Sequence, residues 1–247
     1  MKALRTEVFD RIDSTNLQAR RIAAAGERES TLIIAREQTA GRGRMGRSFY
    51  SPNGTGLYMT LLCYPEAPLC DLAGLTFAAA WATALAIEEL TGATPAIKWV
   101  NDLYLHGRKV CGILCESVGT PHGTAVLVGI GVNLTTRDFP DELAGIAGSL
   151  QTEITPETLA TRICERLLQY VRHPDNALWL DGYRARFMLS GMHVTCMLPT
   201  ERFEATVRGI SDSGSLLVTD QGGQDRELWA GEVSIGATDP ASPFYKS

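Results

Sequence analysis

The chain of 247 residues has the length of one large domain, or of one large and one small domain, at a typical domain size of about 150 residues. Its 23 basic and 28 acidic residues give a net charge of −5, which argues against general binding to nucleic-acid backbones or anionic membranes. Hydrophobic residues at 45% and charged residues at 21% exclude a disordered or collagen-like chain. Any anion site must therefore be local.

No segment of the sequence has the layout of a secretory signal or a membrane span. The N-terminus meets charged residues before any apolar run forms. The longest uncharged stretch, residues 72–87, has 16 residues, whereas a membrane span needs roughly 20. Its many alanines instead predict a buried helix. We therefore expect a cytoplasmic protein that does not bind membranes.

The six cysteines form no CxxC pair and have no histidine-rich companion segment. This spacing argues against a zinc site and against a redox-active dithiol. Reduced thiols, most of them in the core, are the expected state, and no side chain is predicted to be a metal ligand.

Two further segments have the signals of helices. Residues 13–16 read Asp-Ser-Thr-Asn, side chains that accept hydrogen bonds from the free amides at a helix start, and an apolar-periodic segment follows as far as Gly26. Thr155-Pro156-Glu157 supplies a cap residue, a proline for the first helical position and an acid for the first turn. Apolar residues then recur at four-residue spacing to Val171, which predicts the second helix.

Runs of β-branched and aliphatic residues predict strands at 31–35, 56–63 and 124–134. Between residues 98 and 117, two extended segments flank His106-Gly107-Arg108, which predicts a β-hairpin. After about Leu189 the sequence changes to short alternating segments between turn residues, the pattern of a small β-barrel. We therefore expect an α+β fold, with a mixed sheet flanked by helices in residues 1–188 and a barrel in residues 189–247.

The most unusual segment is the glycine-arginine loop, residues 41–48, which read GRGRMGRS. It fits two phosphate-binding patterns on paper, but both need a helix directly afterwards, and residues 49–54 favour turns instead. Residues 36–47 hold four arginines and one glutamate, a local excess of three positive charges. Glycines there let backbone amides approach a ligand. We expect this loop to bind an anion and to act as a lid; the alternative is a solvated loop that binds nothing.

A second cluster of polar residues lies in the predicted hairpin. Lys98 is either a strand residue that reaches solvent and pairs with Asp102, or a functional cation. Lys109 favours the functional interpretation, because Gly112 leaves space beside it. The sequence Gly-Ile-Gly-Val-Asn at 129–133 ends an apolar strand with small residues, which suits the stacking of a flat ring against the backbone.

Taken together, six segments resemble, in the same order, segments of the biotin protein ligases: DSTN at 13–16, EQTAGRGRMGRSFYSPNGTGLYMTLL from Glu37, KWVNDLYL from Lys98, GRKVCGILCE from Gly107, VGIGVNL from Val128 and WAGEVSIG from Trp229. The resemblance implies a catalytic domain around a mixed sheet, followed by an SH3-like C-terminal barrel. It further implies an enzyme that activates biotin with ATP and Mg²⁺ as biotinyl-5′-AMP. Such an enzyme then passes biotin to one lysine of a carrier domain.

The resemblance also implies roles for individual residues. Lys109, Arg44 and Asp102 would be catalytic, the two cations against carboxylate and phosphate and Asp102 toward the attacking amine. Biotin would bind at Ser14, Thr15, Asn16, Gln38, Arg42, Gly43, Arg44, Lys109 and Gly112. ATP would bind at Arg44, Trp99, Asn101, Lys109 and Asn133. Val100, where proline is commoner, and Met45 depart from the family pattern without removing a contact.

The expected partner is the biotin carboxyl carrier protein or domain of acetyl-CoA carboxylase or a related carboxylase. Some ligases of this family carry an N-terminal DNA-binding domain, but the DSTN segment begins at residue 13, so we expect no DNA binding. A homodimer through an exposed sheet edge stays open. Two other functions also stay open: a lipoate ligase or octanoyl transferase, and a non-catalytic nucleotide- or RNA-binding module.

Overall fold

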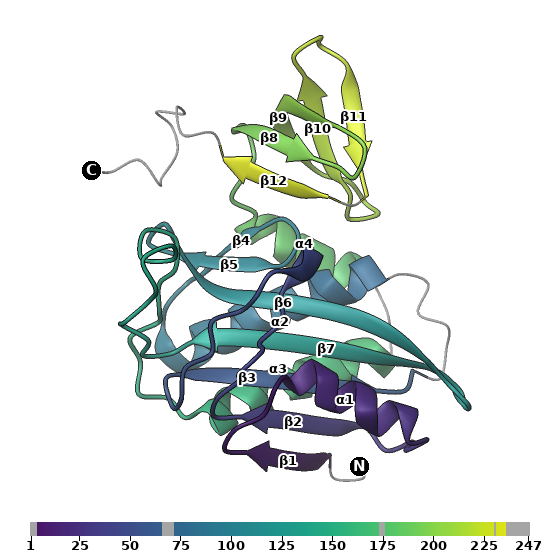
Figure 1. The fold of residues 1–247 in the computed structure, drawn as a ribbon. Coiled ribbons are helices and arrows are strands. Elements are labelled where there is room, and N and C mark those ends of the chain that lie inside the picture. The colour runs from purple at the N-terminus through teal and green to yellow at the C-terminus, as the bar shows by residue number, and fades with distance from the viewer. Residues whose placement is uncertain (1–3, 66–71, 173–175, 230, 236–247) are drawn as a thin grey trace.

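The computed structural model describes residues 4–65, 72–172, 176–229 and 231–235. A seven-stranded mixed sheet forms the larger part (Figure 1). Its strand order is β1-β2-β3-β7-β6-β5-β4, and only the β1–β2 pair is parallel. The strands are β1 (Arg5–Phe9), β2 (Thr31–Ala35), β3 (Gly56–Cys63), β4 (Ala96–Lys98), β5 (Asp102–Leu105), β6 (Arg108–Thr120) and β7 (Gly123–Asn133).

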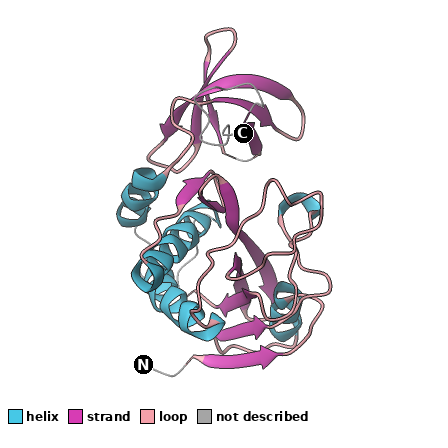
Figure 2. Ribbon diagram, turned by 90° about the vertical axis from the view of Figure 1, so that its left-hand side faces the viewer, coloured by secondary structure: helices cyan, strands magenta, loops and turns pink. Residues whose placement is uncertain are grey.

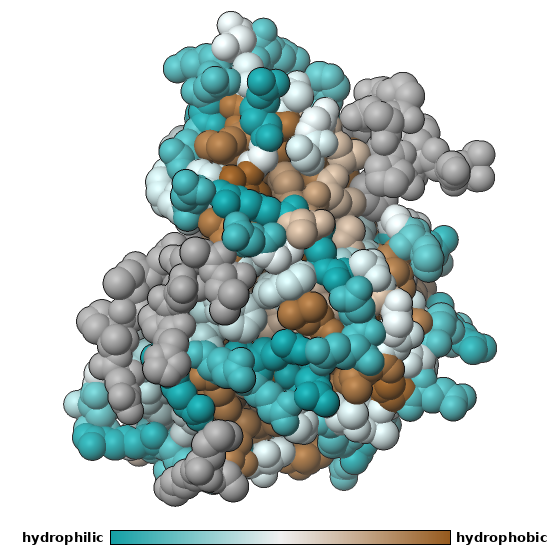
Figure 3. Space-filling model, turned by 180° about the vertical axis from the view of Figure 1, so that it is seen from behind, coloured by the Kyte–Doolittle hydropathy of each residue, from teal (hydrophilic) through white to brown (hydrophobic). Residues whose placement is uncertain are grey.

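Helices cover both faces of this sheet (Figures 1 and 2). On one face lies α1 (Thr15–Ala24), and on the other α2 (Leu72–Thr91), α3 (Pro156–Arg172) and α4 (Asn176–Arg186). Residue alternation along β2 explains the division: Ile33 packs with α1, whereas Leu32 and Ile34 belong to the larger core that includes α2 and α3. From behind, hydrophilic residues cover much of the helical layer (Figure 3).

The second sheet is antiparallel, with the order β11-β10-β9-β8-β12. Within the described residues no pairing joins β11 to β12, so the sheet is open rather than a closed barrel. Trp99 Nε1, in the β4–β5 turn, donates to Gly214 O at 3.2 Å, and Arg184 Nη2, on α4, donates to Ile210 O at 3.0 Å; these bonds fasten this sheet to the larger part of the chain. Its strands are β8 (His193–Met197), β9 (Arg202–Ile210), β10 (Leu216–Asp220), β11 (Asp225–Leu228) and β12 (Glu232–Ile235).

Most predicted elements are confirmed. The strands at 31–35 and 56–63 have the predicted bounds, and the predicted hairpin turns at His106 and Gly107, whose φ angles of 49° and 75° lie in the left-handed region. The helix that follows Thr155 is α3, and Thr155 Oγ1 accepts from the amide of Thr158. β1, β4 and α4 were not predicted, because each is short or lacks a clear apolar period.

The described cysteines agree with the expectation of reduced core thiols. All five are free, four of them are buried, and Cys115 is partly exposed. Burial raises the pKa of the Cys196 thiol to about 11. Cys70 lies outside the described residues. No helix in the described part of the chain is both long enough and apolar enough to cross a membrane.

Candidate active site

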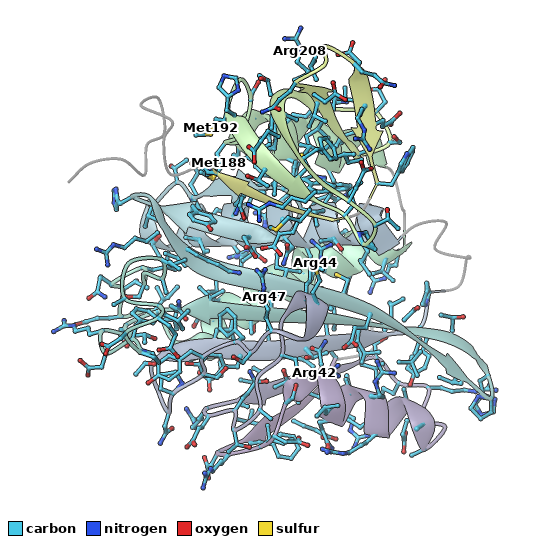
Figure 4. The ribbon with its side chains drawn as sticks, turned by 45° about the horizontal axis from the view of Figure 1, so that its top comes forward. Arg42, Arg44, Arg47, Met188, Met192 and Arg208 are labelled. Atoms are coloured by element: carbon cyan, nitrogen blue, oxygen red, sulfur yellow. The ribbon has the colours of Figure 1, made fainter. Side chains whose placement is uncertain are left out.

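One pocket gathers almost all of the residues singled out in the sequence. Its wall comes from the start of α1, the glycine-arginine loop, the β4–β5 turn, the middle of β6 and β7, and residues 231–233 at the start of β12. Figure 4 shows Arg42 of the loop near α1, and Arg44 and Arg47 nearer to β6 and the second sheet. The predicted residues in the wall are Ser14, Thr15, Asn16, Gln38, Arg42, Gly43, Arg44, Trp99, Asn101, Asp102, Lys109 and Gly112.

A buried polar network occupies the α1 end of the pocket. Gln38 Oε1 accepts from the Thr15 amide at 2.8 Å and from its hydroxyl at 3.1 Å. Thr60 donates to Asn16 Oδ1 at 2.6 Å, and Asn16 Nδ2 donates to Glu116 Oε2 at 2.9 Å. Ser14 stands at the N-cap of α1 but makes no capping hydrogen bond. The Asp-Ser-Thr-Asn segment therefore serves the pocket more than the helix start.

Thr60 and Glu116 belong to this network but were missed in the sequence. Thr60 is fully buried in the middle of β3, and its hydroxyl lies 2.9 Å from that of Thr15. The available signal was a threonine inside an otherwise apolar run, because a buried hydroxyl needs a polar partner. Glu116 carried no such signal, since a glutamate in an alternating strand is usually exposed.

A second polar group lies at the opposite end of the pocket. Arg44 donates to Asn101 Oδ1 at 3.2 Å and to Gly231 O at 3.4 Å. Lys109 Nζ lies 2.7 Å from Asp102 Oδ1, and both side chains are mostly buried. Arg44 and Lys109, 65 positions apart in the chain, therefore line one pocket. Within the described residues no cluster of three or more metal-binding side chains occurs.

A β-bulge points Lys109 into the pocket. The register between β5 and β6 shifts by one residue, so that Leu103 faces Cys111 whereas Tyr104 faces Lys109. Val110 and Cys111 are consequently both buried in the core. The shift places Lys109 on the pocket side of β6, and its ammonium lies 3.3 Å from the position of a Cβ at Gly112.

Lys98 does not form the ion pair with Asp102 that was one of its two predicted roles. It faces Asp102 across the β4–β5 ladder, but the ion pair of that carboxylate is with Lys109. The Lys98 ammonium lies 5.8 Å from the centre of the Tyr104 ring. Burial lowers the pKa of Lys98, and Asp102 partly offsets this effect. The first of the two interpretations of Lys98, an ion pair with Asp102, is therefore wrong, because the bulge brings a second lysine closer.

Glycines in β6 and β7 form a flat surface for an aromatic ring. Gly112 and Gly131 are cross-strand partners, and a Cβ at Gly131 would lie 2.5 Å from a ring carbon of Phe49. The same ring lies 3.2 Å from the corresponding position at Gly112. The ring that lies against these two glycines is therefore Phe49 of the chain itself.

Two predicted ATP-binding residues have other partners. Asn133 does not line the pocket; its Nδ2 donates to Gly148 O at 2.8 Å, while its Oδ1 is buried without a hydrogen bond. Trp99 lines the pocket, but its indole N–H is used by Gly214. Trp99 can therefore offer a ligand only its ring.

An ion pair at the edge of the site makes stability depend on pH. The Arg21 guanidinium, together with the Ser14 amide, holds the pKa of Asp13 below its usual value of 3.8. A carboxylate with a lowered pKa stabilises the fold above that value, and the stabilisation is lost as pH falls through the folded-state pKa. Because the pair is half-exposed, we expect Asp13→Asn to cost less than ~1 kcal/mol at pH 7. Urea unfolding at pH 7 and at pH 3 tests this, and a difference that persists unchanged at low pH contradicts it.

Comparisons with known proteins agree with this geometry. Residues 8–133 match the Biotin/lipoate A/B protein ligase family, and residues 189–236 match the Biotin protein ligase C terminal domain. The chain is 34% identical to a biotin–[acetyl-CoA-carboxylase] ligase of Paracoccus denitrificans, over 92% of this chain and 98% of that one. It is 32% identical to the bifunctional ligase/repressor BirA of Bacillus subtilis, over 94% and 77%.

Among solved structures, the chain is similar to the biotin protein ligase from Aquifex aeolicus in complex with biotin and ATP. The TM-score is 0.79 at 26% identity, and the match covers 94% of this chain and 98% of that chain. The fold, both family matches and the relatives of nearly full length point the same way. This chain belongs to the biotin protein ligase family.

Proposed function

We propose that this pocket joins the carboxylate of biotin to the α-phosphate of ATP and then passes the biotinyl group to a lysine of a carrier protein. In the first step a carboxylate oxygen attacks the α-phosphorus and pyrophosphate leaves, giving biotinyl-5′-AMP. In the second step the lysine amine attacks the acyl carbon, and AMP leaves as an amide bond forms. The observation that supports this best is the convergence of Arg44 and Lys109 in one pocket with a buried polar network.

The buried network suits the ureido end of biotin. That group offers one carbonyl acceptor and two N–H donors on a flat, otherwise apolar ring system, which fits a pocket with a few fixed polar partners. Thr15 donates to Gln38, and Asn16 accepts from Thr60, so these side chains have fixed positions. Ser14 is buried beside them. We assign the ureido group to these four residues and to the backbone at Arg42 and Gly43.

The cationic end suits the reacting groups. Two anions must meet in adenylation, so the main demand is for positive charge rather than for a strong base. Arg36, Arg42 and Arg47 each lie within 4 Å of a carboxylate, whereas Arg44 has only neutral partners within the described part of the chain. Of these four arginines, Arg44 is therefore the one that we assign to the anionic ligand.

Lys109 completes the charge at that end. We assign it to the biotin carboxylate and the α-phosphate, with Asp102 holding its ammonium in place. Mg²⁺ enters with ATP as part of the substrate, because both carboxylates of the cationic end, Asp102 and Glu232, already face a cation of the chain. Trp99 and Asn101 form the wall beside Arg44, where we place the nucleotide. We assign no contact with ATP to Asn133, because this residue does not line the pocket.

Asp102 is the residue that we assign to the second step. The attacking lysine must lose its proton, and Asp102 is the pocket carboxylate nearest to the proposed phosphate site, next to Lys109. As the amine attacks the acyl carbon, the carboxylate can accept or orient that proton, and AMP leaves with the electron pair of the broken C–O bond. A second carboxylate, Glu232, lies at the pocket rim but is paired with Arg47.

Residues of the glycine-arginine loop line the pocket, and we assign to this loop the shielding of the mixed anhydride from water. Gly46 lies in this loop with φ of +75°, a conformation that costs other residues roughly 1–2 kcal/mol. We expect Gly46→Ala to speed the loss of preformed adenylate several-fold. Gly54→Ala is the matched control, because Gly54 has φ of +71° and an equally open surrounding but lies outside the glycine-arginine loop. Equal retention in both variants would exclude the lid role.

Incubation with ATP, radiolabelled biotin and an apo-carrier domain tests the function itself. We expect label on the carrier, dependent on ATP, and no labelling with lipoate in place of biotin. A lipoate ligase would reverse the preference, and a nucleotide- or RNA-binding module would label nothing. The match to the biotin protein ligase C-terminal domain favours biotin.

The partner and the compartment follow from the same chemistry. We propose the biotin carboxyl carrier of acetyl-CoA carboxylase as acceptor, supported by the name of the Paracoccus relative. A carrier from another carboxylase that is labelled faster would overturn this proposal.

We also propose a cytoplasmic location, because the reaction needs ATP and the described cysteines are free thiols.

A further inference from the structure

The glycine-arginine loop touches the second sheet at two neighbouring residues. The Arg47 guanidinium contacts both carboxylate oxygens of Glu232 through its two terminal nitrogens, a bidentate pair. Arg44 donates to the carbonyl of Gly231, the residue directly before Glu232. Two arginines of one loop thus meet two consecutive residues that lie more than 180 positions later in the chain. Figure 4 shows Arg44 and Arg47 on the side of the loop that faces this sheet.

Glu232 lies at the start of β12, where strand pairing and close packing fix the backbone. It pairs with Met197 at the start of the β12–β8 ladder. Gly231 has φ of +126°, and a Cβ there would lie 2.7 Å from Leu198, so the backbone before Glu232 is closely packed. Because Trp99 in the β4–β5 turn and Arg184 on α4 fasten the second sheet to the larger part of the chain, Glu232 has a fixed position relative to the pocket.

The loop side of the contact is less supported. Within the glycine-arginine loop the backbone is tied by the bridge between Arg42 and Ser48 and by two hydrogen bonds, from the Gly43 amide to Arg47 O and from the Arg47 amide to Arg44 O. Met45 at its tip is 68% exposed. Such a segment orders at a cost in backbone entropy that side-chain contacts must offset. The bidentate pair of Arg47 and Glu232 can therefore hold the glycine-arginine loop, which has few backbone contacts, against the start of β12, which has a fixed position.

We propose that Arg47 and Glu232 form a latch that holds the glycine-arginine loop closed over the pocket. Both are positioning residues, since the charge of each is neutralised by the other. The second sheet thus contributes to the reaction by retaining the loop, and through it the adenylate. The part of this inference that concerns the adenylate rests on the proposed function, whereas the latch is a property of the free protein.

Limited trypsin digestion of the ligand-free protein tests the latch by itself. Glu232→Gln removes the charge of the partner and leaves all three loop arginines as cleavage sites. We expect cleavage after Arg44 and Arg47, identified by mass spectrometry, to become about fivefold faster, the change expected from one partly exposed ion pair. Glu201→Gln is the matched control, because it breaks the pair with Arg226 within the second sheet and away from the loop. Equal cleavage rates in both variants would overturn the latch.

Charge exchange tests its role in the reaction. Arg47→Glu and Glu232→Arg should each speed the loss of preformed adenylate about fivefold, with a smaller effect on its rate of formation, and the double exchange should restore most of the retention. A residue needed only for folding would not be rescued by the exchange. If the double variant lost adenylate as fast as expected from the two single variants combined, the latch would be refuted. If the unmodified protein formed no adenylate, the proposed function would fail, and the digestion experiment would still decide the latch.

Discussion

Lys109→Ala is expected to slow biotinyl-AMP formation by roughly a thousandfold, which corresponds to about 4 kcal/mol of transition-state stabilisation. The side chain is 30% exposed and its ammonium points into the pocket, so it acts on charge that develops in a partly dry site. Its loss also leaves Asp102 without its cation. In the mutant, Arg44 would be the remaining assigned cation for the two substrate anions, and the unpaired carboxylate of Asp102 would repel them. Single-turnover formation of adenylate from labelled ATP measures the effect.

Arg108→Ala is the matched control for this experiment. Arg108 precedes Lys109 on β6, is exposed, and donates to Ala144 O outside the pocket. We expect its adenylation rate to stay within about twofold of the unmodified protein, because exposed substitutions away from a site usually have small effects. Near-normal adenylation by Lys109→Ala would refute the assignment of that lysine.

The second large effect is expected at Gly129. A Cβ there would lie 2.1 Å from Asn16 Oδ1, so Gly129→Ala must displace the amide that Thr60 and Glu116 hold. Overpacking of a filled core typically costs about 1–3 kcal/mol, which corresponds to a fall in Tm of ~5 °C for a chain of this size. If Asn16 belongs to the biotin site, biotin binding should also weaken at least tenfold. Thermal unfolding and calorimetric titration with biotin measure the two effects separately.

Gly119→Ala provides the comparison. Gly119 lies in the adjacent strand β6, and no atom lies within 4 Å of the position of its Cβ. We expect unchanged biotin affinity and a Tm within about 1 °C of the parent, because an open position does not overpack. Unchanged biotin affinity in Gly129→Ala, despite the displaced amide, would remove Asn16 from the proposed binding site.

The roles of the arginines at residues 36–47 depend on partners that lie far away in the chain. Residues 36–47 hold four arginines against one glutamate, which predicts an anion site, but the sequence does not distinguish the roles of these arginines. In the structure Arg47 is paired with Glu232, and Arg44 is left with neutral partners. The carboxylate that makes this distinction lies 185 residues away in the chain, where no local pattern connects it to the loop.

Local physical chemistry determined a large part of this protein from sequence alone. Runs of β-branched and aliphatic residues determined the strands at 31–35 and 56–63, a short polar link with a glycine determined the hairpin at Gly107, and apolar spacing determined the helix after Thr155. These features depend on neighbours within a few residues. The family and the residues of the pocket wall also followed from contiguous motifs, each of which lies in a single segment of the chain.

Only the tertiary structure decided which side chains become partners. A single extra residue at the bulge in β6 pairs Lys109, rather than Lys98, with Asp102. Cross-strand pairing of Gly112 and Gly131 provides the surface on which Phe49 lies. Such pairings depend on strand register and on how the two sheets dock, which are set by packing summed over the whole core. A sequence pattern records which residue types are available, and the register decides which of them meet.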